Sequence, residues 1–127
     1  MTRILTIIAL LFATPAYSLS KEVCRDFEAQ AAEMNEKARG GFKVDKYTEL
    51  VLMKVNCGLS DITYSKRLLL PTSTMNSGWQ SRLQRQHSLL HCNGGMSESL
   101  GITVRDNILE PDYQFAHQLV TRPSDCK

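Results

Sequence analysis

Two histidines, His87 and His91, are the residues whose types and spacing point most directly to chemistry. They lie four residues apart in a segment expected to be helical, so both imidazoles project from one helix face and could ligate the same metal ion. A zinc protease of the HExxH type has glutamate directly after the first histidine, whereas this chain has Ser88. A catalytic zinc also needs a third ligand, for which His117 is a candidate. We interpret the pair as flanking or surface histidines and expect no metal and no other cofactor.

Other catalytic patterns are missing from the sequence. No serine lies in a Gly-x-Ser-x-Gly turn, and there is neither a phosphate-binding loop nor a dinucleotide-binding fingerprint. Glu110 and Asp112 are close in sequence, but they flank Pro111 in an expected hairpin turn, which rarely provides the cleft that a glycosidase needs. We therefore predict that the chain is not an enzyme.

The chain has four cysteines, an even number that favours disulfides in an exported protein. None of them forms a Cys-x-x-Cys pair of the kind that redox or zinc sites use. Of the three possible pairings we prefer Cys24–Cys57 and Cys92–Cys126. Cys24 lies on the apolar side of an expected helix and Cys57 ends an expected strand, while Cys92 ends the second helix and Cys126 the last strand. Each bridge would contribute about 3–4 kcal/mol in the chain-entropy model.

The start of the chain has the pattern of a secretory signal peptide. Arg3 precedes an apolar run over residues 4–13, and Ser18 ends a small-x-small cleavage pattern. The run is about half the roughly 20 apolar residues that a membrane-spanning helix needs. We predict a cleaved signal peptide over residues 1–18, with a cut after Ser20 as the alternative. A signal this short is typical of bacteria, so we expect the mature chain in the periplasm or secreted, with no stable membrane anchor.

The remaining residues, 19–127, are expected to form one small domain. The whole chain has 15 Lys and Arg against 13 Asp and Glu, and one of the cations is Arg3 in the leader. The mature chain is therefore close to neutral, which argues against nucleic acid as a partner.

Hydrophobic periodicity predicts two helices and two hairpins in alternation. The first helix spans residues 20–39, with Ser20 as N-cap, apolar Phe27 and Ala31 on one face, and Gly40 as the stop. The other expected elements are a hairpin of strands 43–57 and 62–70, a helix over 75–92 with one further helical turn at 96–100, and a hairpin of strands 102–109 and 113–122.

This order predicts an α+β fold of two layers, with a four-stranded antiparallel sheet and the helices on one face, stabilised by the disulfides. Trp79 should anchor the second helix to the sheet.

Charge is unevenly distributed, because the stretch from residue 62 to residue 97 contains no Asp or Glu. It carries four cations, Lys66, Arg67, Arg82 and Arg85. If the second strand runs beside the second helix, these side chains form a candidate surface for an anionic partner. The alternative is an ordinary solvated helix face.

Taken together, these features predict an exported, non-catalytic binding or accessory protein. Its partner would be a protein or another macromolecule in the cell envelope or outside the cell. The alternative function is a small secreted hydrolase or metal-binding protein that uses His87 and His91.

Overall fold

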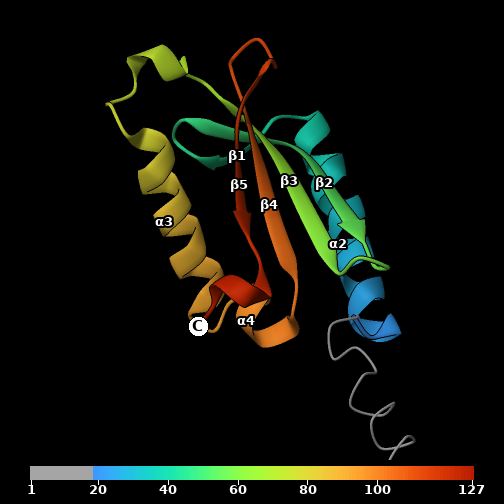
Figure 1. Ribbon diagram of the computed structural model, residues 1–127. Helices are drawn as coiled ribbons and strands as arrows, with labels where there is room; N and C mark the ends of the chain where they lie inside the picture. The colour runs from blue at the N-terminus through green and yellow to red at the C-terminus, as the bar shows by residue number, and fades with distance from the viewer. Residues whose placement is uncertain (1–18) are drawn as a thin grey trace, which may run out of the picture.

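A five-stranded sheet with helices packed against it forms the architecture of the computed structural model, which describes residues 19–127 (Figure 1). The predicted signal peptide, residues 1–18, lies outside the described residues. The elements in chain order are α2 (Lys21–Arg39), β1 (Phe42–Asp45), β2 (Thr48–Asn56), β3 (Asp61–Leu68), the 3-10 turn η1 (Thr72–Thr74), α3 (Trp79–Cys92), α4 (Met96–Leu100), β4 (Thr103–Leu109), β5 (Phe115–Thr121) and the 3-10 turn η2 (Pro123–Asp125).

Helix α2 confirms the first predicted helix almost to the residue. The Ser20 hydroxyl accepts the Val23 N–H at 3.2 Å, which satisfies one of the free amides of the first turn. Phe27 and Ala31 face the sheet, and the helix ends at Gly40. Gly41 follows with a φ of 85°, a conformation that L side chains rarely adopt and that turns the chain back toward β1.

The prediction of one long strand over residues 43–57 is wrong, because the chain reverses within it. Asp45 accepts the N–H of Tyr47 at 2.8 Å, and this side-chain turn separates β1 from β2. A register irregularity between Leu50 and Leu52 then shifts the side-chain alternation. As a result Leu50 and Met53, three residues apart, are both buried.

The prediction of a four-stranded antiparallel sheet is matched in part: β2 pairs with β3 and β4 with β5 in antiparallel fashion, but the sheet has a fifth strand and one parallel pairing. The strand order is β1-β2-β3-β4-β5, and β3 pairs with β4 in parallel. The connection between them contains α3 and α4 and returns the chain to the end of the sheet at which β3 began. A parallel pair requires a crossover of this kind, so the two expected hairpins become one sheet.

Helix α3 starts at Trp79, four residues later than predicted, and ends at Cys92 as expected. The preceding residues form η1, and Gly78 adopts a φ of 79° immediately before the helix. The further turn predicted over 96–100 is α4.

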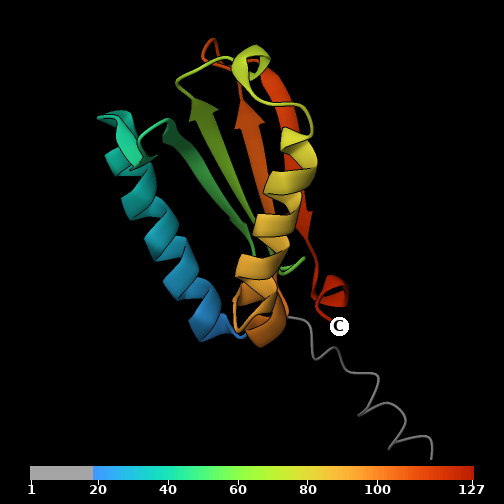
Figure 2. The same ribbon diagram turned by 90° about the vertical axis from the view of Figure 1, so that its left-hand side faces the viewer.

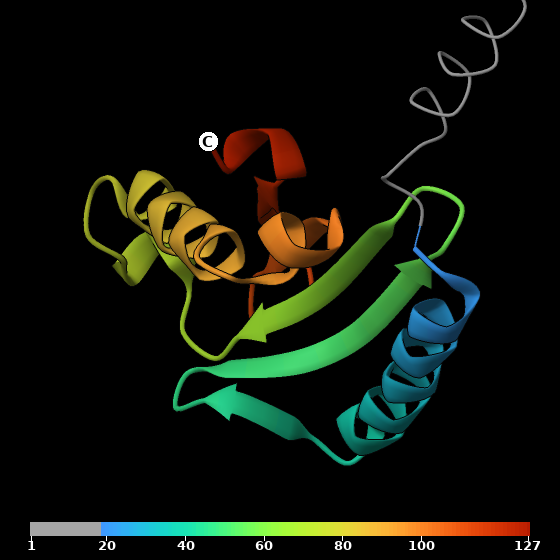
Figure 3. The same cartoon turned by 90° about the horizontal axis from the view of Figure 1, so that it is seen from below.

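Both long helices contact the same face of the sheet, but at different places (Figures 2 and 3). Helix α2 packs over β2, where Ala31 joins a core with Met53, Ile62 and Val104. Helix α3 lies beside β5, where Leu83 covers a second core. That second core contains Leu68, Ile108 and Leu119. The expected helix arrangement is therefore matched in part.

Both predicted disulfides, Cys24–Cys57 and Cys92–Cys126, are confirmed. Their Cα atoms lie 5.9 Å and 5.0 Å apart. The first bridge ties the start of α2 to the end of β2, and the second ties the end of α3 to the chain just after β5.

No helix within residues 19–127 combines the length and apolar character needed to cross a lipid bilayer.

Asn35 on α2 occupies the place that a further strand would take beside β2. β1 pairs with β2 only as far as Leu50. Beyond that point the Asn35 amide donates to the Met53 carbonyl at 3.0 Å and accepts the Met53 N–H at 2.7 Å. One side chain therefore satisfies both backbone groups of a buried residue.

We predict that Asn35→Ala lowers the free energy of unfolding by about 2 kcal/mol, because both Met53 groups lose their partner. Urea denaturation measures the change. The exposed neighbour provides the control: Glu36→Ala should stay within about 0.5 kcal/mol of the parent, since its pair with Arg39 is a surface ion pair. Equal losses of unfolding free energy for the two substitutions would contradict the role of Asn35 as the hydrogen-bond partner of Met53.

Candidate functional site

A cluster of polar side chains lies at the centre of the helix-covered face of the sheet. Asp106 on β4 is only 6% exposed, and Lys66 on the neighbouring strand β3 donates to its Oδ2 at 2.8 Å. Burial by itself would raise the pKa of Asp106. The imidazole of His87, 3.7 Å away, and the ammonium of Lys66 outweigh that effect and hold the pKa below its ordinary value. Asp106 is therefore a buried carboxylate that stays ionised.

The two histidines join this cluster from α3. His87 is buried, and its Nδ1 lies 2.7 Å from the Thr121 hydroxyl on β5. The rings of His87 and His91 meet edge to face, with centroids 4.6 Å apart. Burial, and then the proximity of His87, lowers the pKa of His91. The expectation that His87 and His91 lie on the flank or surface of the helix is therefore wrong, because both rings are buried between α3 and the sheet.

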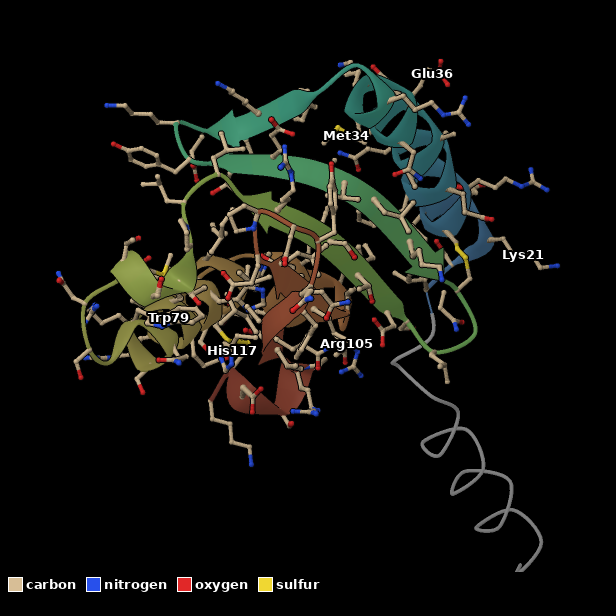
Figure 4. All side chains as sticks on the ribbon, turned by 90° about the horizontal axis from the view of Figure 1, so that it is seen from above. Lys21, Met34, Glu36, Trp79, Arg105 and His117 are labelled. Carbon is tan, nitrogen blue, oxygen red and sulfur yellow. A yellow bond between two sulfur atoms is a disulfide. The ribbon has the colours of Figure 1, made fainter. Side chains whose placement is uncertain are left out.

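A metal centre would need a third ligand beside these imidazoles. The nearest carboxylate, Asp106, is held by the ammonium of Lys66, which competes with any cation. His117 lies instead against Trp79, with ring centroids 5.6 Å apart (Figure 4). Among residues 19–127, one group of three metal-ligating side chains comes together, namely Cys24, Glu28 and Cys57. The disulfide between its two cysteines removes the thiolates that a metal would require.

The four cations of the acid-free stretch are divided over different parts of the fold. Lys66 belongs to the buried cluster. Arg67, the next residue on β3, points to the opposite face of the sheet, where it pairs with Glu49 at 3.1 Å and lies over the Tyr113 ring. Arg82 donates to two backbone carbonyls just before α3. Arg85 is exposed on α3. Of the four cations, Arg85 is therefore the one whose guanidinium has no such contact within residues 19–127 and remains a candidate for binding an anionic partner.

Trp79 takes the anchoring position that the sequence indicates. Its contact with His117 joins the first turn of α3 to β5, and the side chain is half-buried. The two labelled side chains lie close together in Figure 4.

A cleft of about 540 Å³ runs between α3 and the free edge of β5. At one point the two elements are joined by Gln84, whose amide donates to the Val120 carbonyl at 2.8 Å and accepts the Val120 N–H at 3.1 Å. Seven residues line the cleft: Gln80, Ser81, Gln84, Arg85, Ser88, His117 and Gln118. None of these seven carries a carboxylate, so the cleft has a positive bias that comes from Arg85.

Sequence reasoning found Arg85 and the histidine pair but missed Asp106, Gln84 and Gln118. For Asp106 a signal was available. Ile102, just before β4, and Val104 and Ile108 within it alternate along the chain, and Asp106 occupies the remaining inward position. A charged residue in an inward position of such a strand indicates a buried ion pair. The two glutamines carry no comparable signal, because their roles depend on how α3 meets the edge of the sheet.

No family model matches the chain, and no curated protein matches it in sequence. Its structure, however, is similar to that of a solved protein, a pilotin from the Vibrio vulnificus type 2 secretion system, EpsS. The likeness has a TM-score of 0.56 at 11% sequence identity, and it covers 85% of this chain and 98% of the pilotin. The two chains share a fold.

The histidine pair predicts a pH-dependent stability. His91 has a lowered pKa in the folded protein, so the unfolded chain takes up a proton first as pH falls below about 6.5. Stability should therefore decrease between pH 7 and pH 5, before Asp106 protonates. Thermal denaturation across this range measures the slope. His91→Gln should flatten the slope, whereas His117→Gln should retain it; a parent protein with constant stability over the range would refute the prediction.

The buried pair of Lys66 and Asp106 makes a separate prediction. Lys66→Met should destabilise the fold by about 2–3 kcal/mol, because it leaves an ionised carboxylate buried without its partner. Arg105→Met, which breaks the more exposed pair with Asp61, should cost less than about 1 kcal/mol. Chemical denaturation of both variants compares them. Similar losses would show that Asp106 does not depend on Lys66.

Proposed function

We propose that the chain is an exported, non-catalytic accessory protein of the bacterial cell envelope that binds a protein component of a secretion apparatus. The observation that carries the proposal is the fold likeness to a type 2 secretion pilotin over nearly the whole of that protein. The likeness extends through the helices as well as the sheet, because it covers 85% of this chain.

The chemistry of the described residues supports a binding role. The rings of His87 and His91 are packed between α3 and the sheet, and the nearby carboxylate of Asp106 forms an ion pair with Lys66. These groups hold the helix in place. The exposed cleft beside β5, in contrast, presents amides, hydroxyls and one cation, which are groups suited to recognising a polypeptide.

The cysteine chemistry supports an exported location. The two disulfides use all four cysteines of the chain, and disulfides of this structural kind form and persist in oxidising compartments. We infer that the mature protein begins at Leu19, since Leu19 packs against the core and Ser20 caps α2. A cut after Ser20 would remove both residues.

The test uses the complete chain, with its own leader and a C-terminal affinity tag, in the organism from which the sequence comes. We expect purified protein to start at Leu19 by mass spectrometry, and in-cell formaldehyde cross-linking to enrich a component of the type 2 secretion system. We also expect deletion of the gene to reduce the export of that system's substrates. An intact Met1 N-terminus, or normal export together with no enriched secretion component, would overturn the proposal.

A further inference from the structure

We propose that the cleft between α3 and β5 binds an extended acidic segment of the partner protein, which adds a strand to the sheet at the edge of β5. The inference rests on the proposed function, which supplies a protein partner, and it names the surface and the chemistry of the segment bound.

The free edge of β5 offers backbone groups at alternate residues. Val120 directs its N–H and C=O away from β4, because both groups bond to Gln84 on α3. Outward-facing groups recur every second residue along an edge strand, so Gln118 directs its N–H and C=O to the same side. Gln118 is exposed and lines the cleft. Along this edge, Gln84 therefore satisfies the outward backbone groups of Val120, whereas those of Gln118 are accessible to a binding partner.

Gln84 shows how a partner would bind. Its amide makes with Val120 the two hydrogen bonds that a residue of a neighbouring strand would make, one as donor and one as acceptor. A peptide strand continuing the pairing from Gln118 toward the β4–β5 hairpin would repeat this arrangement with backbone groups. Phe115, near that end of β5, is 64% exposed and offers an apolar contact for a side chain of the peptide.

The opposite edge of the sheet is a poorer template. β1 has four residues, two of which are charged, and its pairing with β2 is irregular. Short length, charge and irregularity are the features by which edge strands avoid new partners. β5 has seven residues, from Phe115 to Thr121, and none is an acid, lysine or arginine. Of the two edges, β5 therefore has the character of a pairing surface.

Charge selects an acidic segment. Arg85 lies in the wall of the cleft, and no carboxylate lines it. An Asp or Glu side chain of the bound strand would meet Arg85 without repulsion from a neighbouring acid. A second copy of this chain is a weaker occupant, because pairing two β5 edges would bring two Arg85 side chains into one interface.

The experiment places a photoreactive amino acid at Ser81, in the cleft wall, and separately at Arg25, an exposed position on α2. Both full-length variants are irradiated in the native organism, and the cross-linked peptides are sequenced by mass spectrometry. We expect the photoreactive group at position 81 to capture an acidic segment of a secretion component and the group at position 25 to capture none.

Capture of such a component from the Arg25 position alone would leave the proposed function standing and overturn this inference. Capture at Ser81 of an acidic segment from an unrelated protein would uphold the cleft and overturn the proposed function. Capture of this same chain, or of nothing, at Ser81 would overturn the inference.

A synthetic peptide with the sequence of the captured segment then tests the hydrogen bonds by fluorescence anisotropy. Gln118→Pro removes the outward N–H, whereas Gln118→Ala retains it and likewise removes the side-chain bond to Asn107. We expect the proline variant to bind about tenfold more weakly than the alanine variant. Arg85→Glu should weaken binding similarly, and Arg25→Glu, with the same change in net charge, should not. Equal affinities within either pair of variants would overturn strand addition or the role of Arg85, respectively, and matching circular dichroism spectra would exclude unfolding as the cause.

Discussion

The backbone of a sheet must find partners for its outermost N–H and C=O groups, and this constraint determines how both long helices meet the sheet. On one side β1 stops early, and Asn35 of α2 takes its place against Met53. On the other side Gln84 of α3 does the same for Val120. In each case a primary amide, which donates and accepts at once, replaces a missing strand. The helices therefore contribute directed polar contacts to the sheet edges in addition to apolar cover.

Between these two edges, the centre of the covered face depends on charge. Asp106 lies in a row that is otherwise aliphatic, and it is held there by Lys66 from β3 and by His87 from α3. A buried pair of this kind contributes little net stability compared with apolar packing, yet it disfavours any arrangement in which one member loses its partner. The parallel pairing of β3 with β4 places Lys66 close enough to reach Asp106, so the cluster and the crossover connection support each other.

Local signals in the sequence were sufficient for α2, for the end of α3 and for the disulfides, because a cap, a glycine stop and cysteines at element ends act through near neighbours. They were insufficient where the outcome depends on distant parts of the chain. The turn at Tyr47 carries no glycine or proline, so β1 and β2 looked like one strand. Periodicity contains no information on strand direction, so the sequence pattern predicted two antiparallel hairpins and did not indicate that β3 pairs with β4 in parallel. At the candidate site, the histidines and Arg85 could be selected from the sequence because of their residue types. Gln84 and Gln118 could not, because their roles depend on their positions beside the free edge of β5.

The bridge between Cys92 and Cys126 has a mechanical consequence for the cleft. It fixes the last turn of α3 to the chain just beyond β5, while the first turn is held to β5 by the contact between Trp79 and His117, which is not covalent. Between these two ends, Gln84 and His87 add hydrogen bonds to Val120 and Thr121. The cleft beside β5 is therefore covalently fixed at one end only, and every other contact that sets its width is non-covalent.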